Sequence, residues 1–208
     1  FRTGPLAAAV QFMSYSDAVF LTSQDTGVPA QVTNLTAIPI SIGTLTISDL
    51  AQMQGDNGYT YRENFIPQDA ESWTFYPEVP TNKATVVNLP ISPDGQPRTP
   101  GLYFMRLNVA DAYGYTSTAI LAISRYQTTL KLSPTEVFVW AVDMASNTPA
   151  VGLPVTVYDQ AGSPLATGTT DGDGIFHGPI KEYQDDYDAS FVVLGQPGTD
   201  NFGFAYSF

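Results

Sequence analysis

Hydrophobic and polar residues alternate in short segments along the chain, and no stretch repeats with the period of an amphipathic helix. Glycine, proline, asparagine and aspartate separate these segments at intervals of about ten residues. The clearest segment is the last, where Phe202, Phe204, Tyr206 and Phe208 share one face and small residues occupy the other. The pattern predicts an all-β protein with almost no helix, and we expect this aromatic row to be buried.

The C-terminal part contains seven predicted strands. Residues 137–142 are apolar on both faces, which is typical of a central strand. Residues 160–164 and 171–174 are rich in the residue types that form tight turns. Seven short strands in about 80 residues predict an immunoglobulin-like antiparallel β-sandwich. The predicted strands are 128–132, 137–143, 155–158, 165–169, 175–180, 190–194 and 202–208.

The N-terminal part ends in a predicted hairpin of strands 102–109 and 115–123. The alternating pattern restarts after Ser124, so we place a domain boundary near Tyr126. The linker there is too short for the two parts to tumble independently. The chain is therefore predicted to form two tandem β-sandwich modules, residues 1–126 and 127–208.

Two features of the first module carry narrower predictions. Ile40 and Ile42 alternate in one phase and Leu45 and Ile47 in the other, which predicts a β-bulge at Gly43. Residues 51–71 are the least regular part of the chain and are predicted to form a long exposed loop, with a hairpin as the alternative.

Charge and composition exclude several classes of function. The 208 residues include 8 Lys and Arg against 20 Asp and Glu, a net charge of -12. Such a chain lacks the basic surface that nucleic acid or an anionic membrane requires. No apolar run is long enough for a membrane span, so we expect no membrane insertion. The absence of Cys excludes a disulfide, a cysteine nucleophile or a thioester within this sequence.

The composition also carries an expectation about the source compartment. Charged residues make up only 13% of the chain, while Gly, Pro and aromatic residues are abundant, as in exported β-modules. The sequence begins with Phe1 rather than Met. We interpret it as a piece of a longer exported protein from which any targeting signal has been removed.

The sequence contains only weak candidates for catalytic and metal-binding residues. His177 is the single histidine, and no Gly-x-Ser-x-Gly turn or phosphate-binding glycine loop accompanies it, so we interpret it as structural and expect no catalytic residue. Asp171, Asp173 and Glu182 have the spacing of three calcium-loop ligands. However, Ile175 and Phe176 occupy positions that need an oxygen ligand and a glycine.

We therefore interpret the stretch around Asp171 as an Asp-Gly turn and expect no metal, no cofactor and no response to calcium. The alternative is a site for a hard cation shared with a second acidic cluster, Asp185, Asp186 and Asp188. We interpret that cluster as a solvated loop.

Two further features of the sequence bear on binding. Asn34 begins an Asn-Leu-Thr glycosylation acceptor sequence, which matters only in a eukaryotic secretory pathway. An aromatic cluster could stack on sugars, but sandwich strands also carry aromatics, and packing is the favoured interpretation. Its members are Tyr59, Tyr61, Trp73, Phe75 and Tyr76.

Four stretches of the second module form a recognisable motif: VWAVD at 139–143, TPAVGLPV at 148–155, YD at 158–159 and ATGTTDGDG at 166–174. A strand ending in Asp leads to a Pro-containing loop, then to a strand ending in Tyr-Asp, and then to a hairpin ending in Thr-Asp-x-x-Gly. With this pattern the second module resembles a macroglobulin domain of bacterial alpha-2-macroglobulins. Carboxypeptidase-regulatory, transthyretin-like and collagen-adhesin B-type modules share part of this pattern. The strand containing Trp140 favours macroglobulin, and PGLY at 100–103 is a weaker match to the same domain type.

This resemblance implies a function. Proteins of the family act as periplasmic, cell-envelope or extracellular protease traps, in which a cut bait segment lets the domain array collapse around the protease. The chain would then supply non-catalytic scaffold modules, with the bait and any thioester elsewhere in the parent protein. Its partners would be neighbouring domains and, through the full-length protein, proteases. The alternative is a cell-surface adhesin or carbohydrate-binding pair of modules, which exposed aromatics between Tyr59 and Tyr76 would favour.

Overall fold

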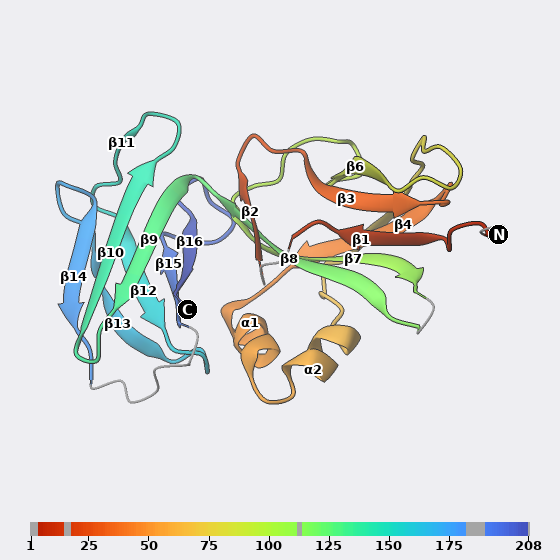
Figure 1. Ribbon diagram of the computed structural model, residues 1–208. Helices are drawn as coiled ribbons and strands as arrows, with labels where there is room; N and C mark the ends of the chain where they lie inside the picture. The colour runs from red at the N-terminus through yellow and green to blue at the C-terminus, as the bar shows by residue number, and fades with distance from the viewer. Residues whose placement is uncertain (1–3, 15–17, 112–113, 182–189, 208) are drawn as a thin grey trace. The chain divides into compact units, whose positions relative to one another are not determined.

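The computed structural model describes residues 4–14, 18–111, 114–181 and 190–207 (Figure 1). Glu182, Phe208 and the acidic cluster at Asp185, Asp186 and Asp188 lie outside these ranges. Internal contacts divide the chain into two compact units. The first comprises Phe1–Leu45, Glu63–Arg98 and Leu102–Leu121, and the second comprises Thr46–Arg62, Thr99–Gly101 and Ala122–Phe208.

The first unit is built on two sheets. One has the strand order β1-β3-β6 and the other β2-β8-β7-β4-β5. Alternate residues of the central strands are fully buried, among them Val28 and Val32 of β3 and Ile40 and Ile42 of β4. The predicted hairpin is confirmed as β7 and β8. The strands are β1 (Ala9–Phe12), β2 (Ala18–Thr22), β3 (Gly27–Thr33), β4 (Ile38–Thr44), β5 (Glu71–Phe75), β6 (Thr85–Pro90), β7 (Gly101–Ala110) and β8 (Thr116–Ser124).

The predicted bulge at Gly43 is wrong. Strand β4 pairs with β7 in continuous register through this position, with Gly43 opposite Phe104. The pattern changes phase because the strand ends at Thr44 and a helix begins at Ile47. Glycine is required at 43 for another reason, since a Cβ atom there would lie 2.4 Å from the Cβ of Pro67.

The predicted loop at 51–71 is also wrong, because this segment contains one short helix and the end of another. Helix α1 spans Ile47–Gln54 and α2 spans Gly58–Asn64. A capping box starts α1, in which Thr46 Oγ1 accepts from the backbone N–H of Asp49 and the Asp49 carboxylate accepts from that of Thr46. The chain is still about 50% strand and about 8% helix, so the all-β class is confirmed.

Helix α1 belongs to the second unit. The side-chain amide of Gln160, in the turn between strands β12 (Pro154–Tyr158) and β13 (Pro164–Thr169), donates to the carbonyl oxygen of Gln54 at 2.5 Å. In the same turn, a Cβ atom at Gly162 would lie 3.0 Å from the Cβ of Ala51. These contacts join the end of the helix to the sandwich.

The second unit consists of two sheets in which all seven predicted strands are confirmed. Strand β10 is central, as predicted, and pairs with β9, β11 and β14. The other sheet has the order β13-β12-β15-β16. Besides β12 and β13, the strands are β9 (Tyr126–Leu132), β10 (Glu136–Asp143), β11 (Thr148–Pro149), β14 (Ile175–Pro179), β15 (Ser190–Leu194) and β16 (Gly203–Ser207).

Strand β15 and residues 203–205 of β16 are buried on both faces of the β13-β12-β15-β16 sheet, whereas no residue of β13 is buried. Val192 and Ala205 point into the sandwich core with Val139 of β10. Phe204 and its neighbour Phe191 lie on the opposite face, at 1% and 0% exposure, with their ring centroids 6.2 Å apart. Phe202 is also fully buried. The predicted burial of the aromatic row is therefore confirmed for Phe202 and Phe204.

Candidate interaction surfaces

The residues that carry the family motif hold turns together. Asp143, at the end of β10, accepts from Arg125 Nε at 2.9 Å and Nη2 at 2.6 Å. Its other oxygen accepts from the backbone N–H groups of Ala145 and Ser146. The hydrogen bonds from Arg125, aided by these backbone bonds, lower the pKa of Asp143 from its usual value. This carboxylate is engaged in closing the turn that follows the strand.

The hairpin motif serves the same purpose. Thr170 Oγ1 donates to the carbonyl of Ala150 at 2.6 Å and accepts from the N–H of Leu153 at 2.9 Å. Asp171 Oδ1 accepts from the backbone N–H groups of Asp173 and Ile175. The interpretation of this stretch as an Asp-Gly turn is confirmed. Within the described part of the chain, no group of three or more acidic or histidine side chains is placed to hold a metal ion.

His177 lies on strand β14 opposite Phe138. Its Nε2 atom is 3.5 Å from Glu136 Oε2, and both side chains are more than half exposed. Such exposed pairs contribute at most about 1 kcal/mol. The structural interpretation of the histidine stays a prediction.

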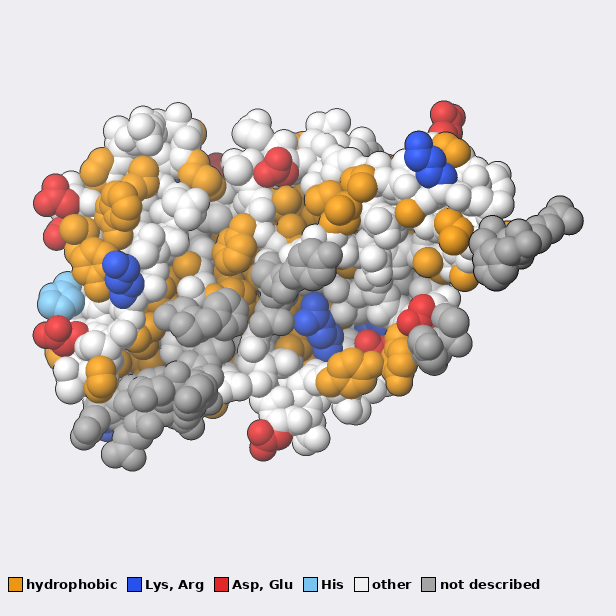
Figure 2. Space-filling model, in the orientation of Figure 1, with side chains coloured by type: hydrophobic (Ala, Val, Ile, Leu, Met, Phe, Trp, Pro, Cys, Tyr) orange, Lys and Arg blue, Asp and Glu red, His pale blue; other side chains and the backbone are white. Residues whose placement is uncertain are grey.

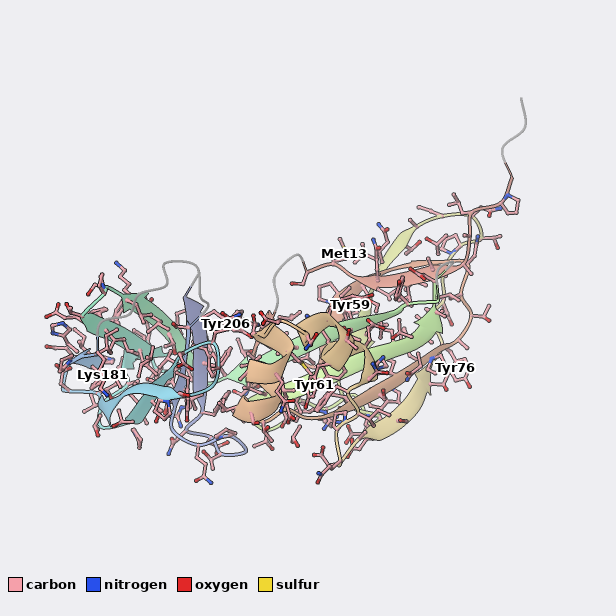
Figure 3. The ribbon with its side chains drawn as sticks, turned by 90° about the horizontal axis from the view of Figure 1, so that it is seen from below. Met13, Tyr59, Tyr61, Tyr76, Lys181 and Tyr206 are labelled. Atoms are coloured by element: carbon pink, nitrogen blue, oxygen red, sulfur yellow. The ribbon has the colours of Figure 1, made fainter. Side chains whose placement is uncertain are left out.

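The aromatic cluster separates into packed and exposed members. Trp73 and Phe75 are half-buried on β5, opposite the buried Ile40 and Ile38 of β4, so packing is confirmed for them. Tyr61 lies on α2 (Figure 3). Its hydroxyl donates to Asp49 Oδ1 at 2.8 Å, and partial burial together with this carboxylate raises the pKa of Tyr61. Tyr59 and Tyr76 are exposed. The carbohydrate-binding alternative stays a hypothesis.

An exposed apolar surface that the sequence analysis did not single out lies on strand β10. Trp140 is 46% exposed, and the half-buried Phe138 and Ile175 share its face of the sheet. Figure 2 shows hydrophobic side chains gathered over this part of the second unit. Trp140, which favoured the macroglobulin resemblance, is therefore a surface residue rather than a core residue.

The glycosylation acceptor Asn34 has an engaged side chain. Its Nδ2 atom donates to the carbonyl of Leu6 at 2.7 Å and to Asn82 Oδ1 at 3.1 Å, while its Oδ1 accepts from the N–H of Asn82. A glycan on this nitrogen would compete with both donations. The side chain instead ties two loops to the N-terminal segment.

A pocket of about 450 Å³ opens on the first unit. Its floor is a row of polar side chains across three paired strands, Ser72 of β5, Ser41 of β4 and Arg106 of β7. Phe65 and Ile66, from the segment that joins α2 to β5, form one wall. The predicted loop thus contains a structured wall, which periodicity alone did not indicate.

Comparison with solved structures identifies the fold. Native alpha-2-macroglobulin from Escherichia coli spanning domains MG0-NIE-MG1 matches 97% of this chain, with 16% identity and a TM-score of 0.71. A structure of the same protein spanning NIE-MG1 matches 95%, with 16% identity and a TM-score of 0.67. A Salmonella alpha-2-macroglobulin mutant matches 97%, with 14% identity and a TM-score of 0.64. The fold is that of these alpha-2-macroglobulin domains.

The macroglobulin resemblance drawn from the motif residues is thus confirmed for the fold. This chain covers 64% of the MG0-NIE-MG1 structure, 96% of the NIE-MG1 structure and 12% of the Salmonella protein. It therefore spans less than two thirds of the first of them. Neither the protein-family models nor the curated protein sequences give a match. Among the described residues, no helix has the length and apolarity needed to cross a bilayer.

Proposed function

We propose that this chain supplies two non-catalytic modules to an exported, alpha-2-macroglobulin-like protein that traps proteases. The observation that supports this most is the match to the NIE-MG1 structure, which covers 95% of this chain and is itself covered over 96% of its length. We further propose that residues 1–126 correspond to the NIE domain and residues 127–208 to the MG1 domain.

The contacts of the motif residues support a scaffold role. The polar side-chain atoms of Asp143, Thr170 and Asp171 form hydrogen bonds that stabilise turns of the second unit. The sequence contains no Cys, so we place any thioester, together with the bait segment, elsewhere in the parent protein. The partners in this proposal are the neighbouring domains and the trapped protease, and the site of action is the periplasm, the cell envelope or the extracellular space.

The test uses the full-length polypeptide with its natural flanking sequence. It is incubated with trypsin, and the residual activity is measured on a large protein substrate and a small peptide substrate in parallel. A trap protects the large substrate while the small one is still hydrolysed, because the enclosed active site stays functional. Equal loss of both activities, or no loss of either, would overturn the proposal.

A further inference from the structure

The pocket of the first unit is built from fixed polar groups. Arg106 donates from Nη1 to Thr116 Oγ1 at 3.0 Å and from Nη2 to the carbonyl of Phe65 at 3.1 Å. Its guanidinium also lies 5.5 Å from the centroid of the Phe104 ring. These contacts hold the positive charge in a fixed orientation at the floor of the pocket.

The neighbouring groups add hydrogen-bonding capacity. The amide of Asn108 donates to Ser41 Oγ at 3.2 Å, which leaves the hydroxyl hydrogen of Ser41 to donate elsewhere. Ser72 lies beside it on β5, and Glu63 adds a carboxylate that accepts hydrogen bonds. Ile66 is 75% exposed at the wall, so an apolar contact surface faces the same hollow.

The charges favour one class of ligand. A volume of about 450 Å³ lies within the range of roughly 300–1,000 Å³ that is usual for small-ligand sites. The single guanidinium in the lining matches one carboxylate. Glu63 and the net charge of -12 disfavour a multiply charged anion such as a polyphosphate. A peptide offers a carboxylate, N–H donors for Glu63 and an apolar side chain for the wall.

We propose that this pocket binds a short peptide segment that carries a single carboxylate. The carboxylate lies against Arg106, the hydroxyls of Ser41 and Ser72 hydrogen-bond to the peptide, and an apolar side chain packs on Ile66. This binding site is independent of protease trapping, and its test succeeds or fails whatever the parent protein does.

The test compares two blocked dipeptides, acetyl-leucyl-glutamate amide and its neutral isostere acetyl-leucyl-glutamine amide. Each is titrated into the labelled 208-residue chain, and heteronuclear NMR follows the backbone amides of Ser41 and Ser72. We expect saturable shifts at these amides with the glutamate peptide and binding weaker by about tenfold or more with the glutamine peptide. Equal binding of the two peptides, or no saturable shift with either, would overturn the proposal.

Two variants and a matched control locate the site. Arg106→Gln should remove the preference for glutamate, whereas Lys83→Gln makes the same charge change at an exposed residue outside the lining and should preserve it. Arg106 also supports Phe65, so Arg106→Gln is interpreted only if its thermal melt matches the wild type. Ile66→Asp alters an exposed side chain and adds a repelling charge at the wall. It should abolish glutamate binding, and unchanged binding in this variant would contradict the assignment.

Discussion

The carboxylate of Asp143 accepts several hydrogen bonds and is nearly buried, with a side chain that is 10% exposed. Arg125 holds its pKa below the ordinary value of 3.8. A carboxyl group whose pKa is lower in the folded state than in the unfolded state stabilises the fold. This stabilisation is complete when the pH is above the pKa of the unfolded state, and it is lost as the pH falls through the pKa of the folded state. The pair should therefore contribute to stability at neutral pH and lose this contribution in acid.

We expect Asp143→Asn to lower the free energy of unfolding by about 1 to 3 kcal/mol at neutral pH, because Arg125 and two backbone N–H groups lose their charged acceptor. The difference from wild type should shrink below about pH 4, as the wild-type carboxylate becomes protonated. Urea melts across a pH series measure this. Asp173→Asn, at an exposed turn position, controls for net charge. A difference that is constant with pH would contradict the assignment.

Gly174 and Gly172 provide a matched pair within one turn. Gly174 has a φ of +74°, and a Cβ atom there would lie 2.4 Å from the carbonyl oxygen of Ala141. A Cβ atom at Gly172 would have no other atom within 4 Å. We expect Gly174→Ala to destabilise the second unit by at least about 2 kcal/mol through backbone strain and steric overlap, and Gly172→Ala to have little effect. Denaturant melts that give equal losses for the two variants would refute this explanation.

The strands of the second unit show which elements can be predicted from sequence. Strand β10 was predicted because an apolar run between turn residues is typical of a central strand, and β16 because aromatic and small residues alternate with period two. The Asp-Gly pairs that contain Gly172 and Gly174 predict the β13–β14 turn, because such pairs are typical of tight turns. The local pattern is thus sufficient to predict these strands and this turn.

Elements that are very short, or that depend on contacts between residues far apart in the sequence, were not predicted. Helix α1 has eight residues, too few to show a helical period, and its one signal is the capping box from Thr46 to Asp49. The local pattern predicts a bulge at Gly43, because it does not show that Pro67 lies against this residue in the folded chain. The pocket around Arg106 needs the pairing of β5, β4 and β7, which periodicity does not specify.

The aromatic face of the β15–β16 pair should contribute strongly to stability. Phe204 is 1% exposed, and its ring packs edge to face on Tyr206 with centroids 4.9 Å apart. We expect Phe204→Ala to cost about 3 to 5 kcal/mol in denaturant melts. Trp140→Ala, at the exposed face of β10, removes a larger ring and should cost less than about 1 kcal/mol. A small loss at Phe204 would mean that this face is not packed in solution.

The whole chain combines two compact units whose sequence ranges interleave. Residues 46–62 and 99–101 belong to the second unit although the first unit surrounds them in the sequence. Removing residues 127–208 would therefore leave α1 without the turn that contacts Gln54. The two proposed modules are better tested together, as the intact 208-residue chain.

We expect this intact chain alone neither to inhibit nor to trap proteases. Trapping requires the cleavage of a bait segment that releases a rearrangement of many domains, and two sandwiches have too little surface to enclose a protease of similar mass. The chain is incubated with trypsin or elastase, and hydrolysis of a large and a small substrate is followed in parallel. Both activities should be unchanged.

Protection of the large substrate alone would assign trapping to these residues and overturn the scaffold role. Loss of both activities would indicate direct active-site inhibition, which a scaffold does not perform. Cleavage within residues 51–71 together with trapping would identify that segment, which holds α2 and part of α1, as the bait.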